Sequence, residues 1–165
     1  MGVWPETIPH AAKAAADRWP HATGLIVGSR SWTFAELWAD ARAATSAFLA
    51  SGIGYGDRIA IWAPNLREWI LAALGAQLAG ATIVTLNTRF KGAEAGDILR
   101  RSRCRMLFAP DQFLGQDYVA LLADQELPDL AETIRIDSGW DSFVARGNGA
   151  ADAGVLGTAQ VLRDA

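Results

Sequence analysis

The longest uncharged stretch of the chain, Trp69 to Thr88, constrains the fold more than any other feature of the sequence. It is long enough to cross a bilayer of roughly 30 Å as a helix. Its composition favours another structure, because Gln77 and several Gly and Ala residues weaken membrane insertion and Thr82 to Thr85 are all β-branched. We therefore predict a buried helix, a turn at Gly80 and a buried strand, and no membrane span.

Helix and strand signals alternate on both sides of this stretch. Thr33 and Glu36 have the spacing of a capping box ahead of apolar residues at helical spacing, and Asn65 and Glu68 have the same spacing. Helices are expected over about 8–19, 33–51 and 65–80, as a short segment ending at Arg100-Arg101, and over about 118–123. Strands are expected over about 25–27, 58–62, 82–86, 106–109 and 133–136.

The expected strands are apolar along their whole length and do not alternate with polar residues. With the order βαβαβ, this pattern predicts an α/β fold, with a largely parallel sheet and helices on both of its faces. Residues 1–146 would form this α/β portion. Residues 147–165 are rich in Gly, Ala and Asp and are expected to be a tail or linker.

Composition excludes several classes of protein. Of the 165 residues, 51% are hydrophobic, which is too many for a disordered chain. The net charge of −3 is unfavourable for general nucleic-acid binding. Cys104 is the single cysteine and there are two histidines, so the sequence predicts neither an internal disulfide nor a zinc site. The N-terminus lacks a signal-peptide pattern, and we expect a cytoplasmic, metal-free protein.

The glycines between Gly52 and Gly56 invite comparison with a dinucleotide-binding turn. They follow a predicted helix and precede a predicted strand, the reverse of the order that places a helix N-terminus at a phosphate. We therefore interpret them as a structural turn. His10 and His21 are interpreted as surface residues and Cys104 as a small buried one, so no catalytic residue is predicted.

The segment from Arg89 to Arg105 contains six basic residues against two acidic ones, a local net charge of +4. One interpretation is a solvated helix end. The other is a surface for a phosphorylated ligand, since arginine offers forked donors to phosphate oxygens.

Residues Trp32 to Asp111 resemble the N-terminal part of acyl-CoA synthetases of the AMP-binding, adenylate-forming superfamily. Four motifs occur in the family's order: T-F-x-E-L, G-x-G-x-G-D-R, P-N-x-x-E-W and L-A-G-A-x-x-V-x-L-N-x-R. The resemblance implies a partial N-terminal domain of an adenylate-forming enzyme. It also implies ATP, Mg²⁺ and CoA as cofactors of the complete enzyme and a carboxylic acid as substrate. Arg89, in the last motif, matches a position near the nucleotide phosphates of CoA in some relatives.

Three hypotheses follow. The first is an N-terminal part of an acyl-CoA ligase of fatty-acid type that is inactive alone, because the family's phosphate loop and C-terminal domain are expected beyond Ala165. The second is a non-catalytic module that binds a CoA-like ligand, pairs with the remainder of the enzyme or forms a homo-oligomer. The third, a dinucleotide-binding oxidoreductase, is disfavoured by the glycine order. Such a partial domain is expected to have low stability.

Overall fold

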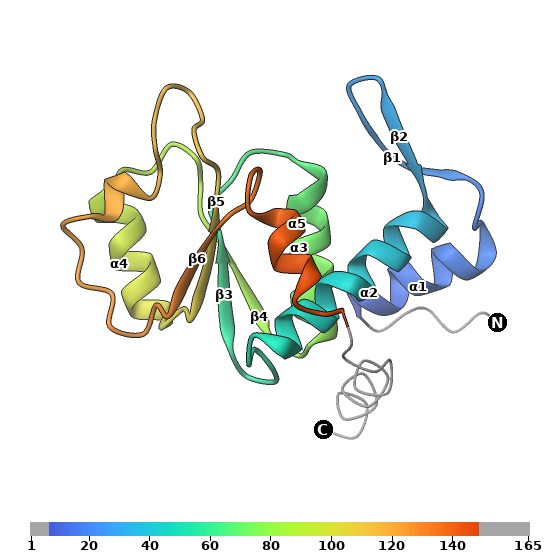
Figure 1. The fold of residues 1–165 in the computed structure, drawn as a ribbon, viewed down its shortest axis with the longest axis horizontal. Helices are drawn as coiled ribbons and strands as arrows, with labels where there is room; N and C mark the ends of the chain where they lie inside the picture. The colour runs from blue at the N-terminus through green and yellow to red at the C-terminus, as the bar shows by residue number, and fades with distance from the viewer. Residues whose placement is uncertain (1–6, 149–165) are drawn as a thin grey trace.

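A computed structural model describes residues 7–148 (Figure 1). The chain forms a four-stranded sheet, a two-stranded hairpin and the helices around them. The elements in chain order are α1 (Ile8–Arg18), β1 (Thr23–Val27), β2 (Arg30–Thr33), α2 (Phe34–Ala50), β3 (Arg58–Ile61), α3 (Arg67–Leu78), β4 (Thr82–Thr85), α4 (Gly92–Ser102), β5 (Met106–Ala109), the 3₁₀ turn η1 (Ala120–Leu122), β6 (Glu132–Arg135) and α5 (Trp140–Ala145).

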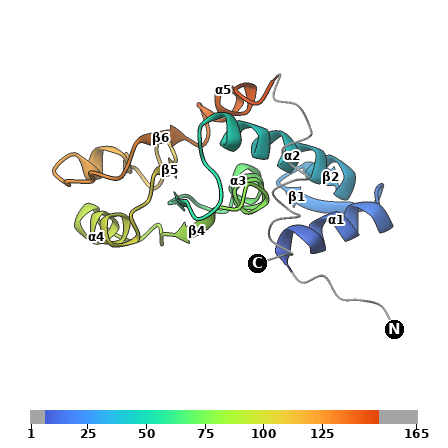
Figure 2. The ribbon, with the colours of Figure 1, turned by 90° about the horizontal axis from the view of Figure 1, so that it is seen from below.

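The sheet is parallel and has the order β4-β3-β5-β6. Its register places Ile59 opposite both Ile83 of β4 and Met106 of β5. Helix α3 connects β3 to its neighbour β4. Helix α4 then connects β4 to β5, the neighbour on the other side of β3. Because such crossovers are right-handed, α3 and α4 lie on opposite faces of the sheet, as Figures 1 and 2 show. The predicted α/β class and the helices on both faces are confirmed.

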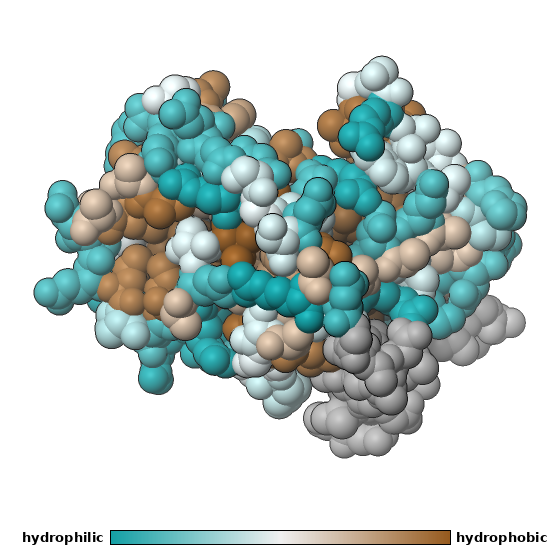
Figure 3. Space-filling view, viewed as in Figure 1, coloured by the Kyte–Doolittle hydropathy of each residue, from teal (hydrophilic) through white to brown (hydrophobic). Residues whose placement is uncertain are grey.

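Two hydrophobic clusters fill the two faces. The side-chain period of two puts Ile59 and Ile61 into the first cluster, under α2, α3 and α5, and puts Ala60 and Trp62 into the second, under α4 and η1. Outer members of the second cluster are partly buried. Figure 3 shows hydrophobic residues reaching the surface at the α4 end of the molecule, with hydrophilic ones around them.

Local signals account for several element boundaries. The Thr33 hydroxyl accepts from the Glu36 N–H at 3.2 Å, and the Thr33 N–H donates to the Glu36 carboxylate at 2.7 Å, which confirms the predicted capping box. Gly80 has φ +86° between α3 and β4, so the predicted turn is also confirmed. No helix within residues 7–148 has the length and apolar character needed to cross a bilayer.

Two predictions about single elements were wrong, and two elements were not predicted. Asn65 does not cap α3, because Leu66 occupies the N-cap position and makes no side-chain capping bond. The helix expected over 118–123 is the single turn η1. The hairpin partner β2 and the helix α5 were not predicted. Of the tail predicted over 147–165, residues 149–165 lie outside the described part of the chain.

Candidate functional site

The parallel sheet brings the loops after all four strands to one edge. In open α/β sheets, ligands bind at this carboxyl edge. Here the loop after β4 meets the loop after β5, and a cavity of about 360 Å³ lies between them. Its lining consists of Thr88, Arg89, Phe90, Lys91, Leu114, Gln116, Tyr118 and Leu121. The predicted site residue Arg89 therefore lies at the edge where the fold class places ligands.

Backbone and side-chain hydrogen bonds fix the loop that carries Arg89. The Asn87 side-chain oxygen accepts from the Arg89 N–H at 2.9 Å, and the Asn87 carbonyl accepts from the Phe90 N–H at 3.0 Å. The Lys91 N–H donates to the Glu94 carboxylate at 2.9 Å where α4 begins. The loop thus has a turn conformation determined by its own sequence.

Two buried aromatic residues donate hydrogen bonds to backbone carbonyls of the same loop. Trp62 Nε1 donates to the Asn87 carbonyl at 2.9 Å, and the Tyr118 hydroxyl donates to the Thr88 carbonyl at 2.7 Å. The two rings meet edge to face, with their centroids 4.6 Å apart. Burial raises the pKa of the Tyr118 hydroxyl, so this group remains a donor at neutral pH.

An ion pair braces the loop after β5 against β6. Both ends of the Asp117 carboxylate contact Arg135, at 2.8 and 3.0 Å. The same carboxylate accepts from the N–H groups of Val119 and Ala120, at 2.9 and 3.1 Å. The Arg135 guanidinium, followed by the backbone N–H donors, lowers the pKa of Asp117 to about 2. The backbone on both sides of Tyr118 is therefore anchored to the sheet.

The basic segment divides into paired and unpaired side chains. Four arginines form ion pairs: Arg100 and Arg101 both pair with Asp97, Arg103 pairs with Asp129, and Arg105 pairs with Asp57. These surface ion pairs agree with the interpretation of the segment as a solvated helix end. The guanidinium of Arg89 is exposed and has no ionic or hydrogen-bonding partner within residues 7–148. Arg89 is therefore the member of this segment best placed to meet an anion.

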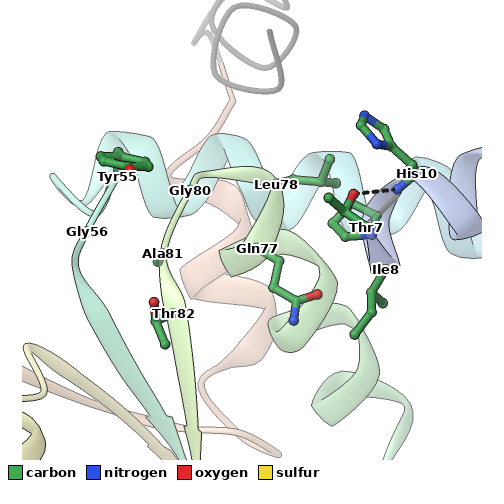
Figure 4. A pocket seen from close by; sticks show the side chains of 11 residues that line it. Thr7, Ile8, His10, Tyr55, Gly56, Gln77, Leu78, Gly80, Ala81 and Thr82 are labelled. Atoms are coloured by element: carbon green, nitrogen blue, oxygen red, sulfur yellow. Dashed lines mark hydrogen bonds between the residues drawn. The ribbon is translucent and has the colours of Figure 1, made fainter. Parts of the chain in front are cut away.

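A larger cavity, of about 560 Å³, lies near the amino ends of β3 and β4 (Figure 4). It is bounded by the start of α1, by the end of α3 and by the turn through Tyr55 and Gly56. The close-up places His10 at its rim, with the His10 N–H bonded to the Thr7 hydroxyl at 3.3 Å. The described part of its lining has no Asp, Glu, Lys or Arg, and it lies at the end of the strands opposite to Arg89. It is a poorer candidate for a charged ligand.

Neither a cluster of metal ligands nor a glycine-rich turn that leads into a helix occurs within the described residues. No group of three or more His, Cys, Asp or Glu side chains gathers within residues 7–148. The glycines from Gly52 to Gly56 form the turn between α2 and β3, as the sequence predicts, and no helix begins there. Cys104 is buried, as expected, and burial raises the pKa of its thiol.

The resemblance to the family indicates Arg89, but the sequence does not indicate the residues that hold its loop. Tyr118, Asp117 and Arg135 lie in segments whose local patterns are weak, and the contact between Tyr118 and Thr88 joins residues thirty positions apart. The Asp117 carboxylate two residues before the Val119 N–H is an Asx-turn signal that could have indicated the start of η1. No local signal could have indicated its pairing with Arg135.

Comparison with known proteins identifies the family. Residues 12–156 match the AMP-binding enzyme family. The chain is 41% identical over 152 residues to the 3-[(3aS,4S,7aS)-7a-methyl-1,5-dioxo-octahydro-1H-inden-4-yl]propanoyl:CoA ligase of Mycobacterium tuberculosis, an alignment that covers 89% of this chain and 30% of that ligase. It is 31% identical over 119 residues to the mitochondrial medium-chain acyl-CoA ligase ACSF2 of Danio rerio, covering 70% of this chain and 20% of that protein. The chain therefore spans less than a third of the length of these relatives.

Solved structures share the fold. The N-terminal domain of FACL13 from Mycobacterium tuberculosis superposes with a TM-score of 0.75 at 27% identity, over 88% of this chain and 37% of that one. A fatty acyl CoA synthetase of the same organism gives a TM-score of 0.74 at 23% identity, over 83% of this chain and 28% of the synthetase, and supports the fold alone. Because the family model matches residues 12–156, this chain belongs to the AMP-binding enzyme family, and its fold is that of the N-terminal domain of FACL13.

Proposed function

We propose that this chain serves in an ATP-dependent acyl-CoA ligase and that its Arg89 loop contributes to binding CoA. In the proposed reaction, a carboxylate oxygen of the acid attacks the α-phosphorus of ATP, and pyrophosphate leaves. The CoA sulfur then attacks the acyl carbon of the resulting acyl-adenylate, and AMP leaves. Membership of the AMP-binding enzymes over residues 12–156 is the observation that carries this proposal.

The proposal places the sites for ATP and Mg²⁺ outside the described residues. Binding of a triphosphate with its metal needs carboxylates for the cation and donors at a helix N-terminus or a glycine-rich loop. Within residues 7–148 no group of three or more His, Cys, Asp or Glu side chains gathers, and the glycine-rich turn from Gly52 to Gly56 leads into a strand. We assign no step of the adenylation half-reaction to these residues and propose that ATP and Mg²⁺ are bound by other parts of the enzyme.

The charge and position of the Arg89 loop support a site for the nucleotide phosphates of CoA. The exposed guanidinium of Arg89 lies beside a cavity of about 360 Å³ that Lys91 also lines. A guanidinium binds phosphate oxygens through two parallel N–H groups, and an ammonium adds charge. The side chains of Arg89 and Lys91 would bind and orient the nucleotide end of CoA at the carboxyl edge of the sheet.

Calorimetry with the 165-residue chain tests this assignment. We expect CoA to bind and pantetheine, which lacks the nucleotide, to bind far more weakly. Arg89→Ala should weaken CoA binding about tenfold, since one charge-assisted contact is lost. Arg101→Ala is the matched control, because this arginine is 80% exposed in the same basic segment and lies away from the cavity. Equal affinities for CoA in wild type and Arg89→Ala would contradict the role of Arg89.

The open edge of the sheet favours the second hypothesis, a binding or complementation module. Strand β4 pairs with β3 on one side and with no other described strand, and its residues Ile83 and Val84 are half-buried. An unpaired strand edge can accept a strand from another chain. If the purified chain sediments as a monomer and does not bind CoA, this hypothesis loses its support.

Three narrower assignments belong to the same proposal. The substrate is a carboxylic acid of unspecified structure. The protein is placed in the cytoplasm, whereas the ACSF2 relative of Danio rerio is described as mitochondrial. The boundary between the α/β portion and a tail at residues 146 and 147 also stays a prediction. Fractionation of the native cell and intact mass of the native protein would test the location and the length of the chain.

A further inference from the structure

Tyr118 makes a single directed contact from an otherwise apolar environment. The side chain is 2% exposed and packs against the rings of Trp62 and Phe113. Its hydroxyl donates to the Thr88 carbonyl at 2.7 Å, across the space between the loops after β5 and β4. A phenylalanine at this position would keep both ring contacts and lose the hydrogen bond.

The acceptor of this bond belongs to the peptide group that leads into Arg89. The Thr88 carbonyl and the Arg89 N–H are the two ends of one planar unit. Tyr118 holds the oxygen end, and the Asn87 side chain holds the N–H end at 2.9 Å. With both ends held, the orientation of this plane is fixed, and with it the direction in which the Arg89 side chain leaves the backbone.

The position of Tyr118 is itself determined by the sheet. Asp117 precedes it and is paired with Arg135 of β6, while the N–H of Val119, directly after it, donates to the same Asp117 carboxylate. Hydrogen bonds thus join β6 to Asp117 and Tyr118 to the peptide before Arg89, and the peptide bond between Asp117 and Tyr118 connects the two. Tyr118 links the loops that follow two different strands.

We propose that Tyr118 is a positioning residue for Arg89, acting through the hydrogen bond from its hydroxyl to the Thr88 carbonyl. The inference rests on the proposed function of Arg89 in binding CoA. Tyr118 does not contact the ligand in this proposal. It restricts the Arg89 backbone to one orientation before the ligand arrives, so that less conformational freedom is lost on binding.

Amide hydrogen exchange tests the positioning without any ligand. In Tyr118→Phe, we expect the Arg89 and Phe90 amides to exchange about tenfold faster than in wild type, because opening of the loop becomes easier. The amide of Leu107, in the centre of the sheet, reports on the fold and should be unchanged. Tyr55→Phe, an exposed tyrosine at the other end of the strands, is the matched control. Unchanged exchange at Arg89, or faster exchange at Leu107 as well, would overturn the proposal.

A double-mutant cycle with CoA as the titrated ligand tests whether Tyr118 acts through Arg89. We expect Tyr118→Phe to weaken CoA binding about three- to tenfold in the wild-type background, the range for one neutral hydrogen bond, and to have no effect in the Arg89→Ala background. Equal effects in both backgrounds would overturn the proposal and leave the role of Arg89 intact. If Arg89→Ala itself binds CoA as wild type does, the proposed function fails, and the positioning role fails with it.

Discussion

A Cβ atom on Gly92 would lie 1.8 Å from the carbonyl oxygen of Leu121, so the first residue of α4 touches the backbone of η1 directly. No side chain can be accommodated there without separating the two elements. The contact lies immediately after Lys91 and three residues after Tyr118, so it also determines how closely the two loops around the candidate site approach each other.

Gly92→Ala should therefore destabilise the protein by about 1–3 kcal/mol, the usual cost of overpacking. Urea denaturation measures this change. Gly96→Ala, in the same helix, is the matched control. Outside α4, the three atoms nearest to a Cβ added there are all side-chain atoms of Gln125, from Oε1 at 2.5 Å to Cδ at 2.9 Å, and none is a backbone atom. The Gln125 side chain can rotate away, and alanine is favoured over glycine in helices by about 1 kcal/mol. A loss of stability as large in Gly96→Ala as in Gly92→Ala would contradict this explanation.

Phe143 packs α5 against α2 and the sheet. Its ring contacts Phe48 and Phe108, with centroids 4.9 and 5.2 Å away, and the side chain is fully buried. We expect Phe143→Ala to cost about 3–5 kcal/mol, a large part of the stability of a domain of this size. Ser142→Ala, at the neighbouring exposed position, should change stability by less than about 0.5 kcal/mol. Thermal unfolding followed by circular dichroism compares the two, and similar melting temperatures would show that α5 does not contribute to the core.

The ion pair between Asp117 and Arg135 predicts a dependence of stability on pH. The pKa of Asp117 falls from 3.8 to about 2 on folding, so its contribution is fully present above the ordinary carboxyl pKa and is lost as the pH falls toward 2. Asp117→Asn should melt below wild type at pH 6, and the difference should disappear by about pH 2. Asp124→Asn, an exposed change in the same loop, should show no such trend. A difference that stays constant down to pH 2 would exclude the carboxylate charge as its cause.

The 165-residue chain should not catalyse acid-dependent exchange between ATP and pyrophosphate. Our proposal assigns no step of the adenylation half-reaction to residues 7–148, in which no group of three or more potential metal ligands gathers. The assay is run with labelled pyrophosphate and several carboxylic acids, beside a full-length acyl-CoA ligase as positive control. Exchange above the level without acid would show that the chain carries adenylation chemistry that we have not assigned to it.

The features that the sequence predicts correctly are those whose structural cause lies within a few residues. The capping pair Thr33 and Glu36 is three residues apart, and the turn at Gly80 depends on one backbone angle. The apolar strands around Ile59 and Leu107 predicted a sheet covered on both faces, because a strand that is buried on both sides cannot alternate.

The failures have physical reasons as well. Asn65 has the right spacing to Glu68, but α3 starts one residue later, at Arg67, and Glu68 pairs with that arginine at 3.4 Å. Strand β2 ends at Thr33, which is also the N-cap of α2. The capping box at Thr33 therefore indicated a helix start and not the end of a strand. At the candidate site, the family resemblance indicated Arg89, whereas the bond from Tyr118 to Thr88 depends on how two distant loops pack.

The central position of β3 has a consequence for synthesis on the ribosome. Arg58–Ile61 is the first strand of the parallel sheet to emerge, yet its two neighbours, Thr82–Thr85 and Met106–Ala109, emerge on either side of the later helix α4. Until β5 is made, the backbone of one edge of β3 is unpaired and its buried side chains have an incomplete environment. Nascent chains whose strands pair only with segments made much later are prone to aggregate before they fold. Translation speed between Thr85 and Met106 should therefore influence the yield of folded protein more than translation speed elsewhere in the sheet.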